Sequence, residues 1–312
     1  MIEVVKYTLA YKAVWDAFVA GAKNATFLFC RDYMEYHADR FVDHSLLFYS
    51  KNELIAMLPA CEQGAAISSH SGLTYGGVIS CPSMKTERML QVFQAMIAYC
   101  QQHGFTSIRY KTVPHIYHQV PAEEDLYALF KSGGRLYRRD VLSVIEQANP
   151  VKYSKTRRWE VKKAHEQGWS LGRSQKFEAF MQLEAQLLKE KYDTSPVHTW
   201  QEMLYLVKLF PDNIKLYTAE KSGELSAGVI IYETAKVAHC QYIASTEEGR
   251  RQGAIPALLN YLITHAYASK KFFDFGTSSD TLYESGLNGT LLANKESYGA
   301  RAVVHDFYTL DI

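Results

Sequence analysis

The strongest chemical signal in the sequence is a basic loop that leads into a helix-forming segment. Arg250 and Arg251 precede Gly253, and apolar residues at helical spacing begin at Ala254. Backbone amides at the start of a helix form an anion site, and a glycine lets a ligand approach the chain closely. The loop therefore predicts a site for a diphosphate group, although a plain basic loop before a helix has the same composition.

A second cationic cluster lies between residues 152 and 168. Its basic residues are Lys152, Lys155, Arg157, Arg158, Lys162 and Lys163. We expect a helix that ends at Gly168, with Arg158 and Lys162 on one face. Trp159 and Val161 are expected to anchor this helix. Such a face is usually only solvated, and the functional interpretation is phosphate binding, either of a nucleotide-sugar or lipid-diphosphate acceptor or of tRNA.

Two histidines lie in segments suited to ligand binding or proton transfer. His198 directly precedes Thr-Trp-Gln-Glu at 199–202, a capping box that predicts the start of a helix. The usual pKa of histidine, about 6.5, suits proton transfer near neutral pH. Small and hydroxyl residues surround His70 and Tyr75 in segment 68–77. That segment is either a ligand-binding turn on the acceptor side or a simple glycine-rich turn.

These residues are positioned by a succession of elements that occurs twice: two helices, a β-hairpin, a helix and a short strand. In the first half the segments are 12–20, 31–40, 46–58, 87–103 and 107–110. In the second half they are 177–191, 199–210, 215–232, 254–269 and 272–275, with an extra strand at 237–243. The repeat predicts two domains, 1–148 and 149–312, with a boundary near 146–153.

The composition is that of a folded, soluble protein. Of 312 residues, 47% are apolar and 21% are charged, and the net charge of +1 gives no global attraction to nucleic acid. The sequence has no basic leader and no run of about 18 apolar residues, so we expect a cytoplasmic location without a membrane span. The five cysteines lie far apart and lack metal-ligand spacing, which predicts reduced thiols and no metal site.

Several motifs resemble those of a known superfamily. The basic loop resembles the pyrophosphate loop of GNAT acyltransferases in Arg250 and Gly253, while Ile255 stands where that motif has a small residue. The segments 242–245, 273–276 and 294–299 look like those of the FemAB-like branch of the superfamily. The resemblance implies an α/β fold of two tandem GNAT-like domains. Each domain would have a mixed, mainly antiparallel central sheet flanked by helices.

The resemblance also implies a mechanism, in which an amine attacks the acyl carbonyl directly and no covalent nucleophile is needed. The donor, acetyl-CoA or another acyl-CoA, would contact Ile243, Ala244, Arg250, Arg251, Gly253 and Ala254 in the second domain. The predicted catalytic residues are His198, Tyr242 and Lys295, although Tyr242 is alternatively a core residue. The predicted substrate-binding residues are His70, Tyr75, Arg158, Lys162, Asp274 and Ser278.

Three functions remain open. The first is N-acyl transfer from acyl-CoA to an amino sugar or another cell-envelope precursor. In this reaction both the donor and the acceptor are small molecules, and the acceptor is one that could bear a phosphate group. The second is a Fem-like ligase that moves an amino acid from aminoacyl-tRNA to a peptidoglycan precursor. No long heptad segment for the coiled-coil arm of such ligases lies between Gly168 and Ile214. The third is a non-catalytic binding protein on a degenerate GNAT fold, which Ile255 motivates.

Overall fold

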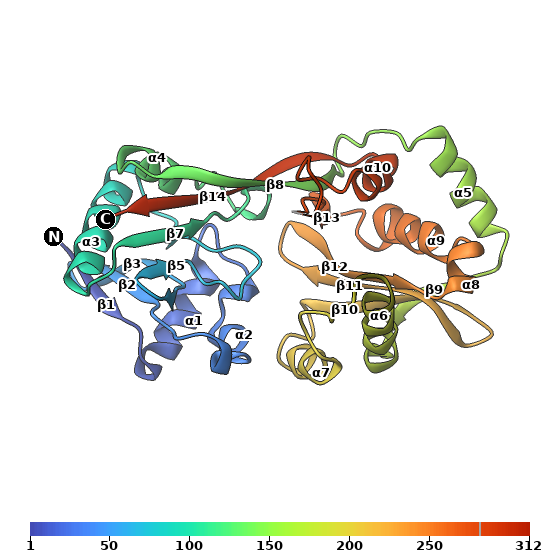
Figure 1. Cartoon of the computed structure of the whole chain (residues 1–312), viewed down its shortest axis with the longest axis horizontal. Helices are drawn as coiled ribbons and strands as arrows, with labels where there is room; N and C mark the ends of the chain where they lie inside the picture. Colours follow the sequence, from blue (N-terminus) through green and yellow to red (C-terminus); the bar gives the residue numbers. More distant parts are fainter. Residues whose placement is uncertain (281) are drawn as a thin grey trace. The chain divides into compact units, whose positions relative to one another are not determined.

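The chain forms two compact units. The structure, a computed structural model, describes residues 1–280 and 282–312, except for the side chain of residue 192. One unit comprises Met1–Asp140 and Val304–Ile312, and the other comprises Val141–Val303. Strands β8 (Arg135–Glu146) and β14 (Arg301–Asp311) run from one unit into the other (Figure 1). The division expected at residues 148 and 149 stays a prediction about the two domains.

The first unit combines two groups of strands with four α-helices. Its strands are β1 (Ile2–Lys6), β2 (Leu46–Ser50), β3 (Glu53–Leu58), β4 (Cys61–Gln63), β5 (Ala66–Ser68), β6 (Ile79–Ser80) and β7 (Ser107–Lys111). Its α-helices are α1 (Lys12–Gly21), α2 (Arg31–Glu35), α3 (Thr86–Gln102) and α4 (Glu124–Lys131). Short 3-10 helices occupy Leu9–Tyr11, Phe27–Phe29, Ala38–Arg40 and His115–Tyr117.

The sheets of the first unit pack around α3. One group of strands has the order β1-β2-β3-β6, and the other has the order β4-β5-β7-β14. The end of the chain belongs to this unit because β14 pairs antiparallel with β7. Met89, Phe93 and Met96 recur on one face of α3 and are fully buried in the core of the unit. Burial of this apolar stripe fixes the helix against the strands.

The second unit is one curled sheet with helices on its faces (Figure 1). Its strands beyond β8 are β9 (Ser170–Ser174), β10 (Ile214–Lys221), β11 (Glu224–Glu233), β12 (Val237–Ser245) and β13 (Phe272–Thr277). Its α-helices are α5 (Lys155–His165), α6 (Phe177–Tyr192), α7 (Trp200–Leu209), α8 (Glu247–Arg251), α9 (Ala254–Tyr261) and α10 (Gly289–Ser297). The strand order is β8-β13-β12-β11-β10-β9, and only β12 and β13 pair in parallel among the described pairs.

The predicted duplication of helices and hairpins is confirmed, as is the mixed α/β fold class. Both hairpins even close in the same way. Lys51 and Asn52 have φ values of 51° and 65°, and Ser222 and Gly223 have values of 53° and 81°. Two consecutive left-handed residues give the turn whose twist matches that of the flanking strands. The two halves therefore share their local geometry as well as the order of their elements.

Some predicted elements differ from the observed ones. The helix expected at 31–40 ends at Glu35, and the helix expected at 254–269 changes at Leu262 into a π-helical turn that ends at Ala266. Several observed elements were not predicted from the sequence, among them β1, β8, β9, α4 and α10. Within residues 1–280 and 282–312, no helix is both long enough and apolar enough to cross a membrane.

Candidate active site

Strands β12 and β13 pair only near the beginning of β12. Their parallel ladder joins Val237, Ala238 and His239 to Phe272, Phe273 and Asp274. Over the described residues this ladder ends at His239, so the later backbone groups of β12 have no partner in β13. Ile243 and Ala244, predicted to contact the donor, lie in this later part of β12. A polar ligand group can reach such an unpaired strand edge.

A β-bulge in β12 sets the direction of the side chains that follow. Opposite β11, Ile230 pairs with Tyr242 and Ile231 pairs with Cys240, which leaves Gln241 as the extra residue. Cys240 lies in the core of the unit, beside α9, and Ile243 packs against the same core. Because a bulge resets the alternation, Tyr242 shares its face of the sheet with His239.

His239 and Asp274 form a buried pair where the ladder ends. His239 Nδ1 lies 2.8 Å from Asp274 Oδ2, and the side chain of His239 is 13% exposed. The other carboxylate oxygen, Oδ1, accepts a hydrogen bond of 2.7 Å from the backbone N–H of Gly276. A carboxylate on Nδ1 fixes the orientation and the tautomer of an imidazole ring. Sequence reasoning identified Asp274 but missed its histidine partner.

Lys295 lies beside this pair. Its Nζ donates to the carbonyl oxygens of Gly276 at 3.1 Å and Thr277 at 2.6 Å, and the residue is 6% exposed. Burial lowers the pKa of Lys295 to about 8, while the nearby carboxylate of Asp274 acts in the opposite direction. Lys295, predicted to be catalytic, therefore holds the end of β13 with two of its three N–H donors.

The two other predicted catalytic residues contact each other. His198 Nδ1 lies 2.6 Å from the hydroxyl oxygen of Tyr242, and the backbone N–H of His198 lies 3.3 Å from the same oxygen. The predicted capping box of Thr199 and Glu202 is confirmed and fixes the chain directly after His198. Tyr242 is 8% exposed and His198 is 3% exposed. Their catalytic roles stay predictions.

The predicted pyrophosphate loop joins β12 to α9. The side chain of Thr246 caps α8 by accepting a hydrogen bond from Gly249, and α8 carries Arg250 and Arg251. Gly253 then adopts a left-handed conformation with φ of 79°, and α9 begins at the buried Ala254. A Cβ atom on Gly253 would lie 3.0 Å from the Cβ of Ala164 in α5. Glycine is required here for its conformation and for the close approach of a neighbouring helix.

A cationic cleft lies between this loop and α5. Its volume is about 690 Å³, which is within the range of small-molecule sites. Its charged lining residues are Arg157, Lys163, Arg250, Arg251 and Glu160. Four cations against one carboxylate make the cleft electropositive. The basic helix and the basic loop, which are far apart in the sequence, thus line a single site.

Arg157 anchors α5 to the rest of the unit. Its guanidinium group donates to Ser297 and Asn294 and pairs with Glu160 at 2.7 Å. It also lies 4.1 Å from the ring centre of Tyr298. Because these contacts fix the guanidinium group, Arg157 contributes its positive charge to the cleft from a constant position.

Helix α5 separates into a buried and an exposed face. Val161 and Ala164 are buried, whereas the predicted substrate contacts Arg158 and Lys162 are exposed and do not line the cleft. The expectation that Trp159 anchors the helix is wrong, because this side chain is 60% exposed. Two hydrophobic residues and Arg157 already supply the buried face, so Trp159 remains at the mouth of the cleft.

The residues predicted for the acceptor side lie mostly inside their units. Tyr75 is 2% exposed, and its hydroxyl lies 2.9 Å from the hydroxyl of Thr26. His70 is 3% exposed, and burial lowers its pKa to about 3. In the second unit Ser278 is 1% exposed, and its backbone N–H donates to the carbonyl of Val141. Contacts of these residues with an acceptor stay predictions.

Sequence reasoning also missed Glu184. This glutamate lies in α6, four residues after Phe180, which packs over Gly228 of the sheet. Burial raises the pKa of Glu184 to about 7. A glutamate at a position of an amphipathic helix that otherwise faces the sheet is the sequence pattern that predicts a carboxylate with a raised pKa.

Comparison with known proteins identifies the family of one segment of this chain. Residues 152–284 match the family model described as an acetyltransferase (GNAT) domain. No curated protein matches the sequence. The second unit, which contains the cationic cleft, is therefore a GNAT-type acetyltransferase domain.

Solved structures extend the likeness to the whole chain. FemX shares 12% identity and a TM-score of 0.68, over 97% of this chain and 96% of that chain. The C-terminal domain of a putative lysylphosphatidylglycerol synthetase from Agrobacterium fabrum shares 10% identity and a TM-score of 0.64, over 97% and 92%. A tandem GNAT protein from the clavulanic acid biosynthesis pathway shares 11% identity and a TM-score of 0.51, over 100% and 98%. At these identities the likeness is one of fold.

The chain therefore carries a GNAT acetyltransferase domain at residues 152–284 and shares a tandem GNAT fold over its whole length. The likeness to the FemAB-like branch that the motifs predicted is confirmed at the level of the fold.

Proposed function

We propose that this chain transfers the acyl group of an acyl-CoA to the amine of an amino sugar or another cell-envelope precursor. The observation that carries the proposal is the cationic cleft, in which Arg250 and Arg251 of the loop face Lys163 of α5. A diphosphate needs several cations and backbone amides in one place, and the start of α9 supplies the amides. The cleft also includes Ser245, the last residue of β12, so bound phosphates would lie next to the unpaired edge of that strand.

The transfer itself needs a carbonyl site and an amine held in line with it. In this proposal the thioester carbonyl accepts hydrogen bonds from the backbone N–H groups of β12 after His239, which have no β13 partner among the described residues. The amine nitrogen attacks the carbonyl carbon, the new C–N bond forms and the C–S bond breaks. The amine loses a proton to a base, and the departing CoA thiolate takes up a proton.

We assign these proton transfers to His239 and to the pair of His198 and Tyr242. His239 is held by Asp274 in the orientation of a general base, and it lies where β12 and β13 separate. His198 contacts Tyr242 on the same face of the sheet, and the tyrosine hydroxyl is a suitable donor to the leaving thiolate. Lys295 keeps the end of β13 in place through its two carbonyl contacts. We assign it a positioning role.

The donor is tested by isothermal titration calorimetry with acetyl-CoA, CoA and pantetheine, which lacks the nucleotide and its phosphates. We expect acetyl-CoA and CoA to bind in the micromolar range and pantetheine to bind at least about tenfold more weakly, because the cleft cations have no phosphates to contact. Absence of acetyl-CoA binding at high micromolar concentration contradicts the proposal. Detection of acyl transfer to any envelope precursor rejects the hypothesis of a non-catalytic binding protein.

The second candidate function is aminoacyl transfer from aminoacyl-tRNA, as in Fem-like ligases. It is favoured by the exposed basic face of α5, where Arg158 and Lys162 lie outside the cleft. A long polyanion would contact both the cleft and this face, whereas acyl-CoA would use the cleft alone.

Arg158 and Lys162 therefore distinguish the two donors. The variant Arg158→Ala/Lys162→Ala is expected to leave CoA binding unchanged under the acyl-CoA proposal. Filter binding of charged tRNA to the wild type, lost in this variant and accompanied by no CoA binding, would establish the ligase instead.

A further inference from the structure

Trp159 is exposed at the mouth of the cationic cleft. The indole is 60% exposed, whereas Trp15 in the first unit is completely buried. The packing of α5 does not explain Trp159, because Val161 and Ala164 supply the buried apolar face of the helix. An exposed tryptophan that lines a cleft is a common means of binding a flat ligand group.

A positive charge lies next to the indole ring. Lys163, one helical turn further along α5, places its Nζ 5.2 Å from the ring centre of Trp159. Both side chains line the cleft, and Arg250 and Arg251 line it from the loop. Over the described residues, neither Lys163 nor Arg250 forms an ion pair with a carboxylate. The cleft therefore combines a flat aromatic surface with cations that are available to a ligand.

We infer that Trp159 stacks on the nucleobase of the donor while the cleft cations bind its phosphates. Aromatic stacking and cationic contacts together are the usual means of binding a nucleotide whose base is unpaired. The inference rests on the proposed function, because it uses the same cleft, and it adds a base-binding residue on α5. CoA and the 3′ end of tRNA both carry an adenosine with phosphates, so the shared ligand chemistry is an adenine nucleotide.

The test separates base stacking from phosphate binding. Calorimetric titrations with inorganic pyrophosphate and with ADP are made on the wild type, Trp159→Ala and Trp159→Phe. We expect the wild type to bind ADP about tenfold more tightly than pyrophosphate, because the base adds a stacking contact. Trp159→Ala should lose that difference and keep its pyrophosphate affinity. Trp159→Phe should retain most of the difference, since phenylalanine also offers an aromatic face.

A matched control is Tyr205→Ala, which removes another exposed aromatic side chain of the same unit. Tyr205 lies in α7, is 53% exposed and does not line the cleft, so its variant should bind both ligands as the wild type does. Thermal unfolding of each variant should match that of the wild type, because exposed side chains contribute little to packing. If Trp159→Ala nevertheless unfolds, tryptophan fluorescence decides the inference. ADP should quench the fluorescence of the wild type, and Trp159→Phe should lose this quenching; equal quenching in both proteins would overturn the inference.

The possible failures are distinguishable. If the wild type binds neither pyrophosphate nor ADP, the phosphate site fails and the proposed function falls with it. If pyrophosphate binds but Trp159→Ala keeps the full preference for ADP, only the stacking inference is overturned. Titration with CoA and with a short oligonucleotide ending in CCA then identifies the source of the nucleotide, since the true donor should show the larger loss in Trp159→Ala.

Discussion

The helices α3 and α9 occupy equivalent positions in the two halves of the chain, but they begin differently. Helix α9 starts after the left-handed Gly253, and the arginines before it line the cationic cleft. Helix α3 starts after Lys85, whose side chain makes no capping hydrogen bond, and the buried Met84 precedes it. The duplicated fold thus supplies two helix starts, and only the start of α9 combines a left-handed glycine with a cationic cleft.

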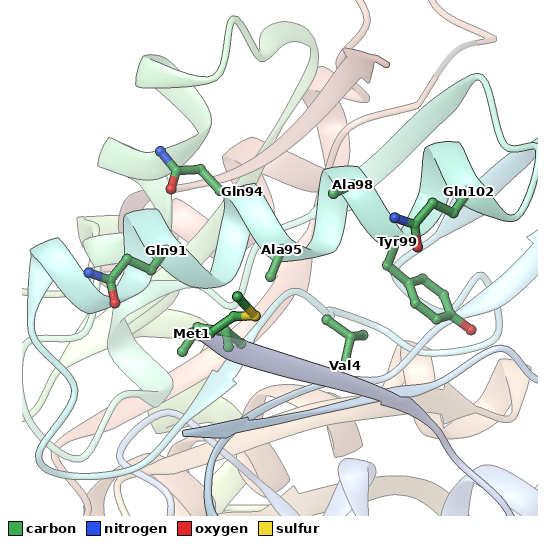
Figure 2. Close-up of a pocket in the computed structure, with 9 residues that line it drawn as sticks. Met1, Val4, Gln91, Gln94, Ala95, Ala98, Tyr99 and Gln102 are labelled. Atoms are coloured by element: carbon green, nitrogen blue, oxygen red, sulfur yellow. The ribbon is translucent and has the colours of Figure 1, made fainter. Parts of the chain in front are cut away.

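The groove beside α3 differs from the cationic cleft in the charge of the side chains that line it. It lies along the middle of the helix, between α3 and β1, and has a volume of about 590 Å³ (Figure 2). Uncharged side chains line it, among them Gln91, Gln94, Ala95 and Ala98, as Figure 2 shows. Without charged side chains, a groove of similar size lacks the cluster of cations that selects an anion. The proposed donor site therefore depends on a few residues added to a fold that both halves share.

The largest expected contrast comes from charge reversal at the two helix starts. Arg250→Glu/Arg251→Glu should weaken CoA binding about 100-fold or more, because two charge-assisted contacts are lost and two repulsive charges are introduced. The matched variant Lys85→Glu/Arg88→Glu, which changes the net charge by the same amount at the start of α3, should leave binding unchanged. Calorimetry at low and high salt measures both effects. Equal losses in the two variants would show that only the overall field of the protein matters.

A second contrast uses two glycines with nearly the same backbone conformation. Gly253 and Gly104, after α3, have φ values of 79° and 78°, but a Cβ atom on Gly104 would meet nothing within 4 Å. Alanine at either position should cost about 1–2 kcal/mol for the left-handed conformation. Gly253→Ala should cost about 1 kcal/mol more, because its Cβ presses on Ala164, and should weaken CoA binding about tenfold.

Urea unfolding and calorimetry on the two alanine variants measure these effects. A loss of CoA binding in Gly104→Ala, or its absence in Gly253→Ala, would show that the close approach of α5 to the loop is unimportant for the ligand.

Local patterns in the sequence predicted much of this contrast, because hairpins, caps and basic loops depend on neighbouring residues. The capping box at Thr199 and the repeated hairpins are examples. Contacts between distant segments were not predictable in this way. The approach of Ala164 to Gly253 and the partner of Asp274 depend on how strands and helices pack. Trp159 was misassigned for the same reason, since helical spacing alone does not say which face of α5 is buried.

The smallest expected contrast concerns a partly buried lysine in the first unit and a buried lysine in the second. Lys111 in β7 donates to the carbonyl oxygens of His70 and Leu73, as Lys295 donates to those of Gly276 and Thr277. Burial lowers the pKa of each lysine from 10.5 to about 8. Between pH 8 and 10.5 the unfolded chain therefore binds more protons at these sites than the folded chain does, and the stability of the fold rises with pH.

The variants Lys111→Met and Lys295→Met should each remove one such contribution. Relative to either variant, the wild type should gain up to about 1.4 kcal/mol per pH unit in this window, and little below pH 8. Urea unfolding at pH 7, 8.5 and 10 measures the gain. The two variants should differ in activity, because only Lys295 lies beside His239 and Asp274, and Lys295→Met should lower kcat with little change in the affinity for CoA. Equal activity of the two variants would mean that Lys295, like Lys111, serves only to hold backbone carbonyls in place.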